Sequence, residues 1–133
     1  MLKVLLVSVA AVFVVGAAQA NTLYRCNLPG KKNSHTVPDE IAIEYDGAKK
    51  TVLVFDAFIN NYFGEPIAAE ILADNAKRLT VGWDFKNIEG RRGSTIPNVR
   101  MKATVLRASN EIHVTTSYGY GDSESGFGTC TVK

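Results

Sequence analysis

The chain has 133 residues, 46% of them apolar, and its 15 Lys and Arg against 13 Asp and Glu give a net charge of only +2 at pH 7. This length suits one domain and not two. The near balance of charge argues against a nucleic-acid-binding protein, which would gather a basic excess on one face.

The first 20 residues have the pattern of a secretory signal peptide. A short positive start with Lys3 precedes an apolar run over 4–18, and residues 18–20, Ala-Gln-Ala, match a small-x-small cleavage site. The apolar run is too short and wrongly flanked for a membrane span. We therefore expect an exported, soluble protein of the periplasm or the extracellular space. Residues 1–20 would be its signal peptide and 21–133 its single β domain, without a transmembrane segment in the mature chain.

Two cysteines, Cys26 and Cys130, lie near opposite ends of the mature chain. In an exported protein such a pair predicts a disulfide bond, and the absence of a C-x-x-C motif leaves a thioredoxin-like role without support. Closing a loop of about 100 residues stabilises the fold by roughly 4–5 kcal/mol in the chain-entropy model. We expect the bridge to tie the first strand to the last, with Tyr24 and Val132 on the same face.

The first half of the domain shows three candidate strands. A short one over 23–27 carries Cys26 and is followed by a loop over 28–38. Apolar residues alternate with polar ones over 40–46, and Asp46-Gly47 begins a tight turn. The continuous apolar run over 51–56 is typical of a strand that is covered on both faces. A long loop with three aromatic residues is expected over 57–65.

The segment 66–74 can be read in two ways. Its Ala, Glu and Leu content and the spacing of Ile67 and Ile71 fit a helix. Read as a strand, it would bury Ile67, Ala69, Ile71 and Ala73. We favour the strand because Asp74-Asn75 makes a good turn into the next alternating segment.

The second half of the domain alternates most clearly. Over 77–85 the inward residues would be Leu79, Val81, Trp83 and Phe85, and a polar loop over 86–96 follows. Residues 97–118 then alternate on both sides of a break at 108–110, which predicts a long hairpin. A Gly- and Ser-rich loop over 119–127 leads to the last strand, 128–133, which carries Cys130.

About eight short strands with regular turn signals predict an all-β fold, a small antiparallel up-and-down barrel or a sandwich. Tight and long connections alternate, so the four long loops, 28–38, 57–65, 86–96 and 119–127, would meet at one end. An eight-stranded barrel has room for its own side chains or for one small ligand. We expect a packed interior with Tyr45, Trp83, Phe85 and Met101 in the core.

The export signal, the Tyr24-x-Cys26 motif, the strand number and the late cysteine together resemble the small disulfide-closed periplasmic barrels of bacterial lysozyme inhibitors. The resemblance implies a closed barrel. The loop motif of those inhibitors, a Ser-Gly pair followed by Tyr, has no match in this chain. Ser125-Gly126-Phe127 is its nearest approach, so membership of that family is not inferred.

Catalytic and metal-binding patterns are weak. The chain has no G-x-S-x-G, H-E-x-x-H or phosphate-binding glycine loop. His113 is expected on the outer face of a strand, and His35 lies in a loop beside acidic residues without enough ligands for a metal. Asp122 and Glu124 lack the further carboxylates of a calcium loop. We expect no enzyme activity, no metal and no cofactor.

The loops offer better candidates for binding. Arg91 and Arg92 could grip a carboxylate or a phosphate, and loop aromatics are common anchors at interfaces. The candidate binding residues are Phe58, Tyr62, Phe63, Arg91, Arg92, Tyr120 and Phe127. The sequence predicts an exported, non-enzymatic binding module that engages a protein or an envelope glycan through the long-loop end. An inhibitor is one form that such a module can take. A small periplasmic hydrolase and a carrier of one small apolar ligand are the alternatives.

Overall fold

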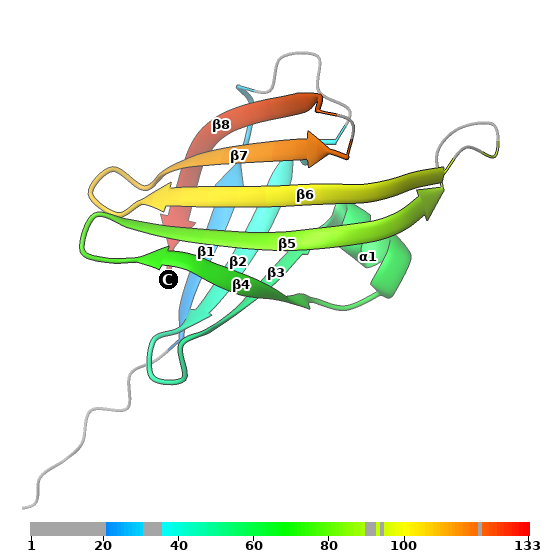
Figure 1. The fold of residues 1–133 in the computed structure, drawn as a ribbon. Coiled ribbons are helices and arrows are strands. Elements are labelled where there is room, and N and C mark those ends of the chain that lie inside the picture. The colour runs from blue at the N-terminus through cyan, green and yellow to red at the C-terminus, as the bar shows by residue number, and fades with distance from the viewer. Residues whose placement is uncertain (1–20, 31–35, 90–92, 94, 120) are drawn as a thin grey trace, which may run out of the picture.

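The computed structural model describes residues 21–30, 36–89, 93, 95–119 and 121–133. Within them, eight antiparallel strands form a closed barrel with one short helix (Figure 1). In chain order the elements are β1 (Thr22–Asn27), β2 (Glu40–Asp46), β3 (Thr51–Asp56), α1 (Ala57–Phe63), β4 (Ile67–Asp74), β5 (Arg78–Glu89), β6 (Thr95–Leu106), β7 (Glu111–Tyr118) and β8 (Ser123–Val132). The predicted all-β fold is confirmed, in its barrel form. The expected signal peptide lies outside the described residues.

The strand order is the simple up-and-down meander that the alternating connections predicted. Each strand pairs with its neighbours in the chain, and β1 pairs with β8 to close the sheet. The tight turns 47–50, 75–77 and 107–110 therefore lie at one end, which we call the tight-turn end. The described parts of the other four connections, with α1, lie at the opposite end, the long-loop end (Figure 1).

One face of each strand points into the barrel and forms the core. The four residues expected there, Tyr45, Trp83, Phe85 and Met101, are all at least nine-tenths buried. The predicted inward residues of β5, β6 and β7 are buried as well, except Tyr118 at the end of β7, which is partly buried. The hydroxyl of Thr116 donates to the Met101 sulfur at 3.2 Å. The segment 66–74 contains strand β4, whose inward Ile67, Ala69 and Ile71 are partly buried against the core.

The expected loop over 57–65 is wrong, because residues 57–63 form helix α1. Asp56 is its N-cap, and the carboxylate accepts a hydrogen bond from the Ile59 amide at 2.8 Å. Gly64 ends the helix in the left-handed conformation, with φ at +72°. Because the two caps are only eight residues apart, the helix is too short for its period of about 3.6 residues to be recognised in the sequence.

Three other boundaries differ from the prediction. The expected loop 86–96 contains the ends of β5 and β6, which pair as far as Glu89 and Thr95. The expected loop 119–127 contains the start of β8, at Ser123. Strand β3 is not covered on both faces, because Leu53 points outward and is 40% exposed. Its alternation is hidden in the sequence because its outward residues are also apolar.

The predicted disulfide between Cys26 and Cys130 is confirmed. The two residues lie directly opposite each other in the β1–β8 register, in which Tyr24 faces Val132. The Cys130 amide donates to the Asn110 carbonyl at 2.7 Å, on the side of β7, so it does not bond to β1. The cysteines therefore occupy a non-hydrogen-bonded pair, the position in an antiparallel ladder where opposite side chains lie closest.

Gly128 allows β8 to approach the end of β1. A Cβ atom at this position would lie 1.7 Å from the Asn27 carbonyl oxygen, which is backbone and cannot turn away. A Cβ at Gly119 would meet nothing closer than 3.9 Å. The strand glycine is thus required for closure of the barrel.

Substituting either cysteine should weaken the fold. We expect Cys26→Ser, Cys130→Ser and the double variant to lower the free energy of unfolding by similar amounts, about 2–5 kcal/mol, because each removes the same cross-link. Urea denaturation measures this. Titration of thiols in unfolded, unreduced wild-type protein is the control, and two reactive thiols per chain would contradict the bridge.

Gly128→Ala should destabilise the barrel, because overpacking against backbone costs about 1–3 kcal/mol or more. Gly119→Ala is the matched control, with the same added methyl group and no close contact. Thermal unfolding of both variants measures the difference. Equal melting temperatures of the two variants would contradict the requirement for glycine at position 128.

Candidate functional site

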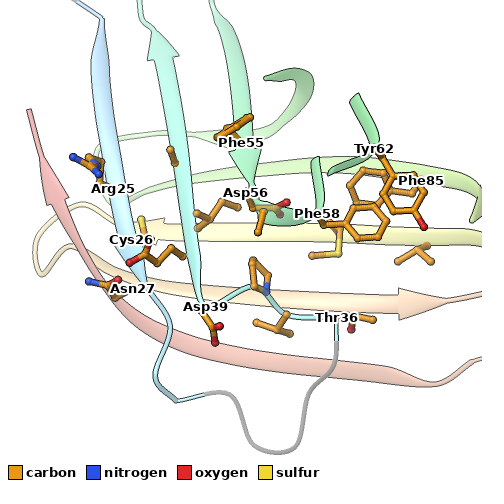
Figure 2. Close-up of a pocket in the computed structure, with 18 of the residues that line it drawn as sticks. Arg25, Cys26, Asn27, Thr36, Asp39, Phe55, Asp56, Phe58, Tyr62 and Phe85 are labelled. Carbon is orange, nitrogen blue, oxygen red and sulfur yellow. The ribbon is translucent and has the colours of Figure 1, made fainter. Parts of the chain in front are cut away.

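A pocket opens at the long-loop end of the barrel (Figure 2). Its lining comes from both faces of the sheet, with Ile41 and Asp56 on the inner face and Arg25, Ala42 and Phe55 on the outer face. The hollow spans about 1040 Å³ over both parts, so the part inside the barrel is smaller. We call this inner part the mouth pocket. Its floor is formed by Ile41, Val99 and Met101.

Aromatic rings from α1 and β5 form one wall of the mouth pocket. The Phe58 ring stacks on Tyr62 with centroids 4.4 Å apart and packs against Phe85 at 4.7 Å. The ring of Phe63 lies 6.2 Å from Phe85. Phe85 is buried, whereas Tyr62 and Phe63 are 48% and 54% exposed. Figure 2 shows the rings of Phe58, Tyr62 and Phe85 gathered on one side of the pocket. We call the exposed pair, Tyr62 and Phe63, the aromatic rim.

Asp56 places a buried carboxylate in the same pocket. The residue is only 5% exposed, and it follows the inward alternation of β3. Burial raises the pKa of its carboxyl, against the opposing effect of hydrogen bonds from the backbone amides of Ile59 and Phe58. No Lys, Arg or His in the described part of the chain pairs with it. It is an acid held in a low-dielectric pocket without a cation.

The structure brings together only some of the candidate binding residues. Phe58, Tyr62 and Phe63 lie together on α1. Phe58 and Tyr62 line the mouth pocket, and Phe63 lies against Phe85 beside it. Phe127 lies elsewhere, on the outer face of β8, where its ring stacks on His113 at 5.8 Å in a shallow groove with Glu111 and Thr129. Arg91, Arg92, Tyr120 and His35 lie outside the described residues.

Glu124 joins separate segments of the chain at the long-loop end. Its carboxylate accepts hydrogen bonds from the hydroxyls of Thr36 and Tyr118, and Tyr118 also donates to Thr36 at 2.8 Å. This cluster ties the connection after β1 to β7 and β8. Asp122 contributes its backbone carbonyl, which accepts from the Tyr118 amide at 2.9 Å.

Sequence reasoning missed Asp56, Phe85 and Met101 as pocket residues. Phe85 and Met101 were assigned to the core, which is correct, but they also form pocket surface. The available signal for Asp56 was its position as an acid at the end of an apolar run, eight residues before Gly64. That pattern indicates a helix cap, whereas the inward position of the carboxylate is seen only in the structure.

A polar cluster lies at the tight-turn end. The Tyr45 hydroxyl donates to Asp74, whose carboxylate also accepts from Arg107 at 3.0 Å and from Lys50 at 3.2 Å. The Tyr45 hydrogen bond lowers the pKa of the Asp74 carboxyl to about 2, with further help from Arg107 and Lys50 and against partial burial. The cluster covers the bottom of the core, at the opposite end from the mouth pocket.

The described ranges hold no group of three His, Cys, Asp or Glu side chains placed to bind a metal ion. None of the helical structure in those ranges has the length and apolar character needed to cross a membrane. Fold and site define a small antiparallel barrel that is packed at one end and hollowed at the other. Comparison of the chain with protein-family models, with curated proteins and with solved structures finds no match in any of the three.

The Asp74 cluster should make stability depend on acid pH. The pKa of Asp74 is about 2 in the folded chain against an ordinary 3.8, so its contribution is fully present above about pH 4 and is lost as the pH falls through 2. We expect Asp74→Asn to lower the melting temperature at pH 7 and to have a much smaller effect near pH 2. Asp84→Asn, which removes an exposed partner of Arg100, is the control of equal charge. A pH-independent loss at Asp74 would contradict the assignment.

Proposed function

We propose that the protein is an exported, non-enzymatic binding module that engages a protein or an envelope glycan through its long-loop end. The observation that carries this proposal is the aromatic rim above the mouth pocket. Two large rings are half exposed there, next to a hollow lined by both apolar and acidic side chains. The signal-peptide pattern and the disulfide support export to an oxidising compartment.

The rim has the physical properties of a binding anchor. Tyr62 stacks on Phe58 and Phe63 lies against Phe85, so both rings are held in place before a partner arrives. Helix α1 is itself fixed at both ends by Asp56 and Gly64. Pre-ordered aromatic side chains lose little conformational entropy on binding and bury a large apolar area.

A carrier of one small apolar ligand is the second candidate. It is favoured by the lining of the mouth pocket, which includes barrel-core residues such as Val99 and Met101. The hydrolase alternative has less support. A hydrolase of this kind would need a histidine in its cleft, and the one described histidine, His113, lies in the outer groove with Phe127, away from the mouth pocket.

The rim is tested by a double variant, Tyr62→Ala with Phe63→Ala. Because both rings are half exposed, we expect its melting temperature to fall by no more than a few degrees. We also expect it to lose the envelope protein or glycan that the immobilised wild-type protein retains from an envelope extract.

Phe127→Ala is the matched control, since it removes an equally exposed ring from the outer face of β8. It should retain the partner as the wild type does. Retention by the rim variant, or equal loss in the rim and control variants, would overturn the proposal. The retained material is identified by mass spectrometry of peptides and of released sugars.

A further inference from the structure

We propose that the mouth pocket binds a small organic cation, a protonated amine on an apolar body, with Asp56 as its counter-ion. The inference rests on the proposed function and deepens it, because it names the chemistry that the long-loop end accepts. Three features carry it: the buried carboxylate, the aromatic wall beside it and the charge of the surrounding lining.

No cation among the described residues pairs with the carboxylate. Its described bonds are those from the amides of Ile59 and Phe58, which cap α1. The acids of the ion pairs seen among the described residues, Glu70, Asp74 and Asp84, lie nearer the surface than Asp56 and face Lys50, Arg100 or Arg107. A buried acid without a charged partner raises the energy of the empty pocket, and a bound cation would remove that penalty.

The aromatic wall suits the same ligand. Phe58, Tyr62 and Phe85 line the pocket that Asp56 also lines (Figure 2). Aromatic faces attract cations through the ring quadrupole, and the attraction strengthens where water is excluded. The floor of Ile41, Val99 and Met101 provides the apolar contact for the body of the ligand.

The described lining of the whole hollow contains four acids, Asp39, Glu40, Asp56 and Glu89, of which only Asp56 is buried. Its one described base, Arg25, belongs to the outer face of β1. Basic residues of the adjoining connections, such as Lys31 and Arg91, lie outside the described residues. A probe of opposite charge is therefore part of the test.

The preference of the pocket for a charge is tested with three probes that share a phenyl group and differ in the charge of their polar end: 2-phenylethylamine, 2-phenylethanol and phenylacetate. Trp83, the single tryptophan, lies opposite the floor residue Met101 and reports binding by fluorescence, with calorimetry as a second measurement. The mature, disulfide-bonded chain should bind the amine about tenfold or more tightly than the alcohol, as expected for a charge-assisted hydrogen bond. We expect no measurable binding of phenylacetate.

Asp56→Asn removes the charge and keeps a side chain that can cap α1. It should weaken amine binding about tenfold and leave the alcohol unchanged, whereas Asp84→Asn, a control of equal charge on the outer face, should alter neither. If Asp56→Asn does not fold, the wild-type ranking of the three probes decides alone. A short lysine peptide is titrated beside the amine, and the tighter of the two assigns the cation to a partner side chain or to a free amine.

Equal binding of amine and alcohol, a preference for phenylacetate, or no binding of the amine or the lysine peptide would overturn the inference. The proposed function would still stand if the aromatic rim variant lost its envelope partner. In the reverse case, with selective amine binding and no effect of the rim on retention, the pocket assignment would stand and the rim proposal would fail.

Discussion

The pairing of β1 with β8 is the constraint on which the rest of the structure depends. Every other pair in the barrel joins strands that are adjacent in sequence, so only this pair must bring the two ends of the domain together. Its loop-closure entropy is the largest in the fold. The Cys26–Cys130 bridge, with a sequence separation of 104, removes that cost from the folding reaction, and Gly128 supplies the space for the approach. Closure leaves no unpaired edge in the sheet and creates an inside that side chains can fill or leave open.

Whether the interior is filled depends on the lengths of the strands. β5 and β6 have 12 residues each, twice as many as β1 and β3, so they extend past the rest of the wall at the long-loop end (Figure 1). Helix α1 packs its aromatic side chains against Phe85 on this extension. At the opposite end the Tyr45, Asp74 and Arg107 cluster covers the core. The same closed sheet is therefore packed at one end and hollowed at the other, and the hollow faces the connections.

The sequence predicted the strands well because side-chain alternation is a local property. Residues such as Leu79, Val81 and Trp83 could be placed inward without knowledge of any partner strand. Elements without a local period were harder to predict. Helix α1 has seven residues, so its caps were the only signal. The Gly- and Ser-rich first part of β8 resembled a loop, although one of its glycines, Gly128, serves close strand approach. The mouth pocket could not be predicted, because it depends on how side chains from β2, β3, α1, β5 and β6 meet in space.

At residue 56 the side chain that best stabilises the empty barrel differs from the side chain that best binds a cation. Ser, Thr and Asn cap helices about as well as Asp, so the cap of α1 does not by itself require a charge. Burial of the carboxylate makes the charge costly, as the raised pKa of Asp56 indicates. An uncharged cap would serve the empty barrel at least as well. The amides of Ile59 and Phe58 offset part of this cost, and a cation bound against Phe58 and Tyr62, as proposed above, would offset more of it. Sites that trade stability for function are expected where local rules of folding are broken in this way.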